Sequence, residues 1–419
     1  MAMLYVIESS VIGPAYIRQA AKEFGLEVTY LSKVSNQEGD ALRQMLAGRV
    51  LQCDTEDVEG MAALIREDTD QRNLAGVVTF LDSRLSVCAE LCRILAVNGA
   101  DPAILAIKSK AVVNGLIPEY VPRSLAFDAR NAPAEQLRQM LAESHHGLIA
   151  KPAFAAGGKG YKEIATEAEL LPATQLVDGQ LSPVLKPYEL VVQERVVGEL
   201  VSLEGFVTGG TLHFLGATGR RKRGNSESVF IFPYDDRIDG AALAKAKEAV
   251  LALVERSGYE NGFFHTEFIV EGANAWLIDA NFGRPGGANL AEVFSASFGV
   301  DPSAFYALVL SVNLFGHALR VETWEKPRLP ALGLAYGLPE RGRLLAIEGL
   351  EGPSSRHTLA QNFGCSVDAM GESNWAWVGL LAGPHASVLA DLATLRLRTN
   401  QGLVAPAWYG SDDFLESQA

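Results

Sequence analysis

Cysteine is scarce in this sequence, with four residues in a chain of 419. Cys53, Cys88, Cys92 and Cys365 match no zinc-binding spacing, and Cys88 and Cys92 lie four residues apart in an apolar helical pattern. This usage argues against a disulfide framework and against a cysteine-ligated metal centre. We expect free thiols in a reducing compartment.

Long apolar runs and an excess of positive charge are also missing. No stretch reaches the roughly 18 consecutive apolar residues of a membrane span, and the first residues, MAMLYVIESSVIGPAY, lack the basic start and cleavage site of a secretory signal. Lysine and arginine number 36 against 50 acids, and the net charge of −14 opposes nonspecific binding to nucleic acid or anionic membranes. We therefore expect a cytoplasmic protein that binds neither nucleic acid nor membranes. Any anionic ligand would have to be bound by a local cluster of positive groups.

The composition is that of a globular protein, 48% hydrophobic and 21% charged, and the length favours about three domains. Strands alternate with helices near the N-terminus, which predicts an open parallel α/β domain. Later segments predict α+β structure, with a hairpin about 208–210 and helices over 241–258 and 386–398. The division that we expect is an N-terminal α/β domain (1–108), a small lid subdomain (109–200), a core (201–326) and a C-terminal α+β portion that completes the core (327–419).

The stretch LIAKPAFAAGGKGYKEI (148–164) places Lys151 at the end of an apolar strand pattern and Lys159 within a glycine loop. Bare backbone and lysines together suit a polyphosphate. The loop is not a Walker A motif, because Gly160 follows Lys159 where that motif has Ser or Thr, and it lacks the full dinucleotide fingerprint. In protein kinases the strand lysine follows the glycine loop, whereas here it precedes it. Taken alone, the stretch could also be an ordinary surface turn.

Residues 263–287, FFHTEFIVEGANAWLIDANFGRPGG, predict a hairpin followed by a turn. A three-residue loop at 272–274 would place Glu267 opposite Asp279 and His265 opposite Asn281. Opposed acids destabilise a sheet unless something neutralises them, and with the Asn281 carboxamide they offer the oxygen ligands that Mg²⁺ prefers. Alternation sends the other side chains to the packed face, namely Phe264, Thr266, Phe268, Trp276, Ile278 and Ala280. In a different register, one acid would instead point to solvent.

The turn after this hairpin carries Arg284, with Gly286 and Gly287 behind it. Glycines there let a ligand approach the backbone closely. Beside a metal and phosphate site, Arg284 could stabilise charge on a transferring phosphoryl group; alternatively it is a surface arginine paired with a carboxylate. For the basic run 220–223 we favour a solvated face over contact with a phosphate or a substrate carboxylate.

Together these motifs resemble the ATP-grasp superfamily, in particular its carboxylate–amine ligases. The signatures occur in the family's order: the lysine strand and glycine loop (151–160), the nucleotide hinge VVQERVVGE (191–199), and an acid followed by acid-x-Asn and an arginine–glycine turn (267–287). The stretch SKAVVNGLIPEYVP (109–122) is similar to the segment that carries an earlier ATP-contacting lysine, best matched by Lys110, with Lys108 as a rival. The resemblance implies an N-terminal α/β domain followed by an ATP-grasp fold with a lid subdomain.

The resemblance also implies roles for individual residues. Lys151 would contact the phosphates and the adenine edge, and Lys159 with the glycine-loop amides would close over the β- and γ-phosphates. The family's ribose-binding acid is missing, because Leu200 stands in its place, and Glu199 is the substitute that we expect. The full set of expected nucleotide contacts is Lys110, Lys151, Gly157, Gly158, Lys159, Gly160, Gln193, Glu194, Arg195, Val196 and Glu199. The metal ligands would be Glu267, Asp279 and Asn281. The catalytic residues would be Arg284 and Lys159, and the substrate contacts would be Arg284, Gly286, Gly287 and His265. For His265, an equal alternative is a histidine whose hydrogen bonds are satisfied within the hairpin.

The function that the resemblance implies is an ATP-dependent ligase that joins a carboxylate and an amine through an acyl phosphate, releasing ADP and phosphate. The sequence is most similar to stand-alone ligases that form dipeptides and related amides, some of which serve peptide-antibiotic pathways. We expect ATP and Mg²⁺ as cofactors, with two metal ions and Mn²⁺ as a substitute, small-molecule amino acids as substrates, and a homodimer as one option. Other ATP-grasp activities, such as a carboxylase component or a purine-pathway ligase, and a nucleotide-binding module without turnover remain alternatives.

Overall fold

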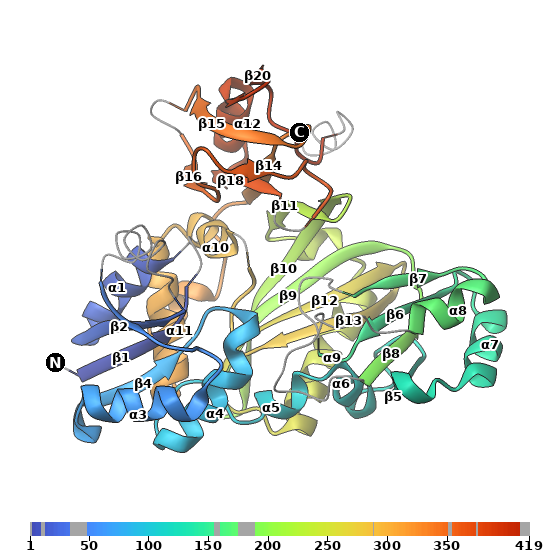
Figure 1. Ribbon diagram of the computed structural model, residues 1–419, viewed down its shortest axis with the longest axis horizontal. Helices are drawn as coiled ribbons and strands as arrows, with labels where there is room; N and C mark the ends of the chain where they lie inside the picture. The colour runs from blue at the N-terminus through green and yellow to red at the C-terminus, as the bar shows by residue number, and fades with distance from the viewer. Residues whose placement is uncertain are drawn as a thin grey trace.

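In a computed structural model of the chain, the structure describes residues 2–9, 13–33, 48–154, 160–174, 189–287, 289–350, 354–373 and 376–410. These residues form four sheets. In Figure 1 the N-terminal domain and the lid lie on opposite sides of a long central sheet, and the C-terminal portion stands above it. The residues Gly157, Gly158 and Lys159 of the glycine loop lie outside the described residues, so the contacts expected of them stay predictions.

The N-terminal domain is an open sheet of parallel strands in the order β3-β2-β1-β4, as its alternating sequence predicts. Buried aliphatic and aromatic side chains fill the strands; in β1 every residue from Met3 to Ile7 is buried. The elements are β1 (Ala2–Ile7), α1 (Pro14–Glu23), β2 (Leu26–Ser32), β3 (Arg49–Gln52), α3 (Val58–Asp68), η1 (Gln71–Asn73), β4 (Leu74–Val78), η2 (Asp82–Arg84), α4 (Leu85–Leu95) and α5 (Ile104–Ile107). Cys88 and Cys92 are buried in α4, and all four cysteines are free, as expected.

The lid is a small antiparallel sheet in the order β5-β8-β6-β7, with two helices packed on it. It has its own apolar core, in which Leu137 and Met140 pack on Leu148 and Val192. The elements are α6 (Lys110–Leu116), β5 (Ser124–Asp128), η3 (Ala129–Asn131), α7 (Ala134–Glu143), β6 (Leu148–Pro152), β7 (Lys162–Ile164), α8 (Glu167–Thr174) and β8 (Glu189–Glu194).

The central sheet has eight strands in the order β13-β12-β9-β10-β11-β14-β18-β16. The predicted turn at 209–210 and the helix over 241–258 are confirmed: Thr208 pairs with Thr211 across two glycines of positive φ, and Gly258 ends α9 with φ 67°. The elements are β9 (Glu199–Thr208), β10 (Thr211–Arg223), β11 (Ser226–Phe232), η4 (Asp235–Arg237), α9 (Gly240–Ser257), β12 (Gly262–Glu271), β13 (Asn274–Phe282), α10 (Leu290–Phe298), α11 (Pro302–Phe315), η5 (Val321–Trp324), β14 (Ala331–Gly337), β16 (Arg356–Leu359) and β18 (Trp377–Pro384).

The C-terminal portion adds three strands to the central sheet and forms a four-stranded sheet of its own, in the order β17-β15-β19-β20. The helix expected over 386–398 is too long: α12 ends at Thr394, and Arg396–Thr399 form a strand whose alternation buries Leu397 and exposes Arg396 and Arg398. The remaining elements are β15 (Gly342–Glu348), β17 (Ser366–Val367), α12 (His385–Thr394), β19 (Arg396–Thr399) and β20 (Gly402–Val404).

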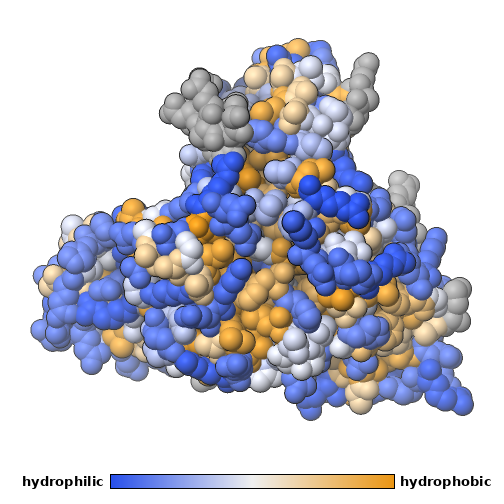
Figure 2. Space-filling model, turned by 180° about the vertical axis from the view of Figure 1, so that it is seen from behind, coloured by the Kyte–Doolittle hydropathy of each residue, from blue (hydrophilic) through white to orange (hydrophobic). Residues whose placement is uncertain are grey.

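Figure 2 shows a rear face that is mainly hydrophilic, with hydrophobic residues gathered in its middle. Within the described residues, no single helix is long and apolar enough to cross a membrane. The helices α10 and α11 pass that test only as a pair, and they are bent by 107° at their junction. Both are largely buried inside the protein, where their apolar side chains pack in the core.

Candidate active site

The predicted pair of opposed acids is present on the hairpin β12–β13. Glu267 lies directly opposite Asp279, and His265 lies opposite Asn281. The loop length was wrong, because Glu271 pairs with Asn274 across a two-residue turn. A bulge between Glu267 and Phe268 adds one residue to β13 and so restores the expected register at the acids.

The same bulge overturns part of the predicted packing. On the loop side of the bulge the alternation of β13 is reversed, so Ala275 and Leu277 are buried while Trp276 and Ile278 are only half-buried. Trp276 lies outside the packed face, with the Lys245 ammonium 4.2 Å from the ring centroid. The predicted core positions Phe264, Thr266 and Phe268 are fully buried.

Two lysines from the lid side approach these acids. Lys110, in the first turn of α6, lies with its Nζ 2.9 Å from Asp279 Oδ1, and its backbone N–H donates to the carbonyl of Ala153 just beyond β6. Lys151, on β6, donates from Nζ to the carbonyl of Ile278 at 2.8 Å. Burial, followed by the charge of Lys110, lowers the pKa of Lys151 to about 8. Two cations are therefore held beside the acids, ready to neutralise an anionic ligand.

Lys108, the rival of Lys110, is bonded elsewhere. Its Nζ forms an ion pair with Asp82, in η2 of the N-terminal domain. Lys110 is thus the lysine that reaches the opposed acids, and its expected contact with ATP stays a prediction.

Arg220 neutralises the other acid. Its Nη1 donates to Glu267 Oε1 at 2.5 Å, and its Nη2 forms an ion pair with Glu227. Its side chain is only 4% exposed, so the expectation of a solvated basic run fails at this residue. On β10 the neighbours of Arg220 point elsewhere: Arg221 pairs with Glu199, and Arg223 donates to the carbonyl of Trp408.

His265 lies beneath the acids in a buried polar network that the sequence did not reveal. Its Nδ1 is 2.8 Å from Glu204 Oε1, and its Nε2 is 3.2 Å from Arg220 Nη1. Burial acts to lower the pKa of His265, but the charge of Glu204 and the hydrogen bonds to Glu204 and Glu267 together outweigh it and raise that pKa to about 9. His265 is 3% exposed, and its polar partners come mainly from β9 and β10 and not, as the alternative expected, from the hairpin itself. A substrate contact of His265 stays a prediction.

Arg284 is held by an acid of the N-terminal domain. Asp82 Oδ1 lies 3.4 Å from Arg284 Nε, and Arg284 Nη1 donates to the carbonyl of Pro285. Burial acts to raise the pKa of Asp82, but the charges of Lys108 and Arg284 hold it well below its usual range. Sequence reasoning missed Asp82, although its place just after the carboxyl end of β4 is where open parallel sheets put their functional residues.

The turn after Arg284 is packed tightly against the site. A Cβ on Gly286 would lie 2.3 Å from Leu290 Cδ1 and 2.8 Å from His265 Nδ1, whereas one on Gly287 would meet nothing within 4 Å. Gly286 is therefore required for packing, and Gly287 leaves room above the turn.

The predicted nucleotide hinge (191–199) begins within β8 and ends at the first residue of β9. The backbone N–H of Glu194 donates to the carbonyl of Arg123, and the backbone N–H of Arg195 donates to the carbonyl of Gly147. These two N–H groups therefore already have hydrogen-bond acceptors within the protein. Gln193 is 2% exposed, and its Nε2 has no partner among the described residues. Glu199 accepts from Tyr234 Oη at 2.5 Å and pairs with Arg221. The adenine and ribose contacts of Gln193, Glu194, Arg195, Val196 and Glu199 stay predictions.

The acids fit a hard cation. Among the described residues no group of three or more His, Cys, Asp or Glu side chains forms a preformed metal cluster. Glu267 and Asp279 nevertheless present opposed carboxylates, and Asn281 Nδ2 lies 3.3 Å from Asp279 Oδ2. Mg²⁺ commonly takes only one or two protein carboxylates and completes its shell with phosphates and water, so this donor set suits it.

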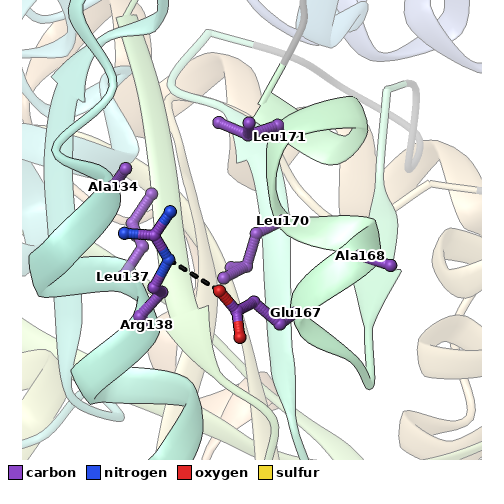
Figure 3. Close-up of a pocket in the computed structure, with 7 residues that line it drawn as sticks. All are labelled: Ala134, Leu137, Arg138, Glu167, Ala168, Leu170 and Leu171. Carbon is purple, nitrogen blue, oxygen red and sulfur yellow. Dashed lines mark hydrogen bonds and ion pairs between the residues drawn. The ribbon is translucent and has the colours of Figure 1, made fainter.

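A separate pocket lies on the lid, between α7 and α8 (Figure 3). Arg138 and Glu167 bridge its mouth, with Nε 2.7 Å from Oε1, and Leu137, Leu170 and Leu171 line it. The residues that line this pocket include none of those predicted for the active site.

Comparison with known proteins finds sequence relatives for part of the chain. No family model matches the sequence. The chain is 26% identical over 213 residues to the phosphoribosylamine–glycine ligase of Methanococcus vannielii, which covers 45% of this chain and 48% of that protein. The corresponding ligase of Methanosarcina barkeri is 27% identical over 176 residues, covering 36% of this chain and 38% of that protein. The chain thus spans less than half of the length of these curated relatives.

Solved structures match over nearly the whole chain. An L-amino acid ligase from Bacillus licheniformis has a TM-score of 0.74 at 18% identity, covering 95% of this chain and 98% of that one. The chain has the ATP-grasp fold. Phosphoribosylglycinamide synthetase from Anaerococcus prevotii superposes with a TM-score of 0.70 at 16% identity (94% and 99% covered). The biotin carboxylase domain dimer of the Hydrogenobacter thermophilus 2-oxoglutarate carboxylase, in complex with MgADP, has a TM-score of 0.72 at 15% identity (95% and 90% covered).

The ATP-grasp fold confirms the predicted fold class. An open parallel α/β domain precedes a lid and a large antiparallel sheet, and the C-terminal strands complete that sheet. The domain boundaries and the roles of individual residues in the ATP-grasp site are not tested by these matches, so they stay predictions.

Proposed function

We propose that the protein is an ATP-dependent carboxylate–amine ligase whose product is a dipeptide or a related amide. The observation that carries the proposal is the opposed pair Glu267 and Asp279, each already paired with a cation, Arg220 and Lys110 respectively. A site built of acids and buried cations suits a metal–polyphosphate complex better than it suits a neutral ligand.

The reaction has two steps. A substrate carboxylate attacks the γ-phosphorus of ATP, the bond to the β-phosphate oxygen breaks, and an acyl phosphate and ADP result. The amine then attacks the acyl carbon, phosphate leaves, and the amine nitrogen loses a proton as the amide forms. Positioning and charge neutralisation are sufficient for both steps, since no redox chemistry is involved.

The residues of this chain divide that work. Lys110 and Lys151 bind phosphate oxygens, and Arg284 stabilises the charge on the transferring phosphoryl group. Glu267, Asp279 and Asn281 would hold Mg²⁺, which neutralises phosphate charge when bound. Lys159 and the glycine-loop amides, which lie outside the described residues, would close over the phosphates and keep water from the acyl phosphate.

The similarity to the L-amino acid ligase over almost the whole of both chains supports amino acids as the substrates. A cytoplasmic location, a role in an antibiotic pathway and a homodimer remain expectations. A second candidate, a purine-pathway ligase that joins glycine to a phosphorylated sugar amine, is favoured by the sequence match to phosphoribosylamine–glycine ligase.

The deciding experiment measures ADP release with a matrix of carboxylates and amines, including pairs of amino acids. Release that requires both an amino acid carboxylate and an amine supports the proposal. Release only with glycine and phosphoribosylamine would favour the second candidate. ATP binding without release for any pair would instead make the protein a nucleotide-binding module.

A further inference from the structure

Glu204, on β9, is a buried acid that the reaction above does not use. It is 1% exposed, and its Oε1 lies 2.8 Å from His265 Nδ1 and accepts from the Ser202 hydroxyl at 2.7 Å. A carboxylate oxygen only accepts hydrogen bonds, so Nδ1 is the donor to Glu204. Its Oε2 has no hydrogen-bond partner among the described residues. A buried carboxylate is costly unless its charge and hydrogen bonds are compensated, so its presence here calls for a physical reason.

Strand register places Glu204 on the same face of the sheet as the opposed acids. His265 of β12 lies opposite Glu204 on β9 and opposite Asn281 on β13. Two residues further along β12, Glu267 lies opposite Asp279. Because side chains two positions apart on a strand share a face, the Glu204 carboxylate and the opposed acids belong to one polar surface.

The ring of His265 connects Glu204 to Glu267. Its Nε2 lies 3.3 Å from Glu267 Oε1 and 3.2 Å from Arg220 Nη1, and Arg220 Nη1 donates to the same carboxylate oxygen at 2.5 Å. The turn after Arg284 packs against the ring, since a Cβ on Gly286 would lie 2.8 Å from Nδ1. Without an acceptor at Glu204, rotation of the ring about its Cβ–Cγ bond would take Nε2 away from Glu267. The bond from Nδ1 to Glu204 therefore fixes which way the ring faces.

We propose that Glu204 is a positioning residue: by fixing the orientation of the His265 ring, it holds the Glu267 carboxylate where that carboxylate binds Mg²⁺. The inference rests on the proposed function, from which it takes Glu267 as a metal ligand. Carboxylates that bind metal ions are themselves held by hydrogen bonds, and loss of such a partner commonly lowers metal affinity about 10- to 100-fold. Arg220 and His265 both meet Oε1 of Glu267, and a carboxylate held through one oxygen can offer the other to a metal ion.

The test compares the affinity for MgADP with the affinity for ADP in the presence of EDTA, both by calorimetric titration. Glu204→Leu has a similar volume but no acceptor. Its affinity for MgADP should fall about 10- to 100-fold, and its affinity for metal-free ADP should stay within about threefold of the wild type. A merely structural role of Glu204 would weaken both forms of ADP equally, and that result would overturn the proposal. Unchanged MgADP affinity in Glu204→Leu would overturn it too.

Two further variants make this comparison specific. Glu204→Gln keeps an acceptor oxygen for His265, so its MgADP affinity should stay within about threefold of the wild type; a loss as large as that of Glu204→Leu would contradict orientation by this hydrogen bond. Glu292→Gln changes another buried acid, 1% exposed in α10, and is the control that should bind MgADP as the wild type does. Thermal unfolding shows whether each variant is folded. If Glu204→Leu is not, Glu204→Asp takes its place, because its carboxylate is withdrawn from His265 by one methylene; it should lose MgADP affinity at least about fivefold, and unchanged affinity would overturn the proposal.

Turnover separates this inference from the ligase function. In Glu204→Leu the Mg²⁺ concentration that gives half-maximal ADP release should rise about tenfold or more, and saturating Mg²⁺ should recover most of the wild-type rate. If the MgADP affinities differ as expected but no pair of carboxylate and amine supports ADP release, the positioning role stands and the ligase function falls. If ADP is released with the same Mg²⁺ dependence in Glu204→Leu and in the wild type, the ligase function stands and the positioning role falls.

Discussion

Asp82 and Arg284 lie 202 positions apart in the sequence, yet Asp82 Oδ1 is 3.4 Å from Arg284 Nε. The contact joins the N-terminal domain to the turn that follows β13. Because Asp82 also pairs with Lys108, it fixes two cations on the side of the site where Lys110 binds Asp279. The N-terminal domain therefore helps to shape the catalytic surface.

Replacing Asp82 with asparagine should release Arg284 from this position. We expect kcat to fall about 10- to 100-fold with little change in the affinity for ATP, because misplacement of a transition-state cation costs rate more than it costs ground-state binding. Steady-state kinetics measure kcat, and nucleotide titration measures the affinity for ATP. Asp70→Asn, which changes an exposed acid of the same domain, is the control. Equal losses in kcat and in ATP affinity would argue for a general structural role.

The opposed acids give a second prediction. Glu267→Gln should lower Mg²⁺-dependent turnover at least about 100-fold, since it removes a charged metal ligand and leaves Arg220 without one of its acids. Glu271→Gln changes an exposed acid on the same strand and should leave Mg²⁺-dependent turnover nearly unchanged. The measurement is ADP release as a function of Mg²⁺ concentration. A fully active Glu267→Gln would refute the assignment of the metal ligands.

The register of these acids shows how far the sequence could lead. Alternation predicted that Glu267 faces Asp279, and it does. The predicted loop was one residue too long, and an unforeseen bulge in β13 compensates for that error. Bulges depend on local packing, which single-sequence patterns do not contain. The reversed burial of Trp276 and Leu277 follows from that same bulge.

Long-range contacts were the other limit. The motif order predicted Lys110, Lys151 and the opposed acids, because each lies in a short local signature. Asp82 and Glu204 carry no such signature and become functional candidates only where distant elements meet. Arg220 ends a run of six buried residues in β10 (215–220), and no alternation in the sequence separates it from the basic residues that follow.

Lys151 gives a third prediction. Lys151→Ala should weaken ATP binding about tenfold or more, because it removes a buried cation whose Nζ lies 2.8 Å from the carbonyl of Ile278, next to Asp279. Lys162→Ala removes a lysine of the neighbouring strand that donates to the carbonyl of Pro172, and it serves as the control. Fluorescence titration with a nucleotide analogue compares the affinities. Equal affinity of Lys151→Ala and the wild type would exclude a phosphate contact by this residue.

The two glycines after Arg284 give a matched pair of variants. Gly286→Ala would push a methyl group into Leu290 and the His265 ring, and overpacking of this kind costs about 1–3 kcal/mol. Gly287→Ala meets nothing within 4 Å, so its stability should match the wild type. Chemical denaturation measures both free energies of unfolding. If both variants were equally stable, the close approach of Gly286 to His265 would be wrong.

The last prediction concerns the pH dependence of stability at Glu292. Its pKa is about 7 in the folded protein and 4.5 as an ordinary side chain, so folding favours the protonated form. Well below pH 4.5 the carboxyl is protonated in both states and does not affect stability. Between about pH 4.5 and 7 the unfolded chain ionises while the folded protein keeps the proton, so the free energy of unfolding falls by up to about 3 kcal/mol and is level above pH 7. Glu292→Gln cannot ionise, so its free energy of unfolding should gain on that of the wild type between pH 4.5 and 8. Denaturant titrations across this range measure the difference, and parallel curves would show that Glu292 ionises as readily in the folded protein as in the unfolded chain.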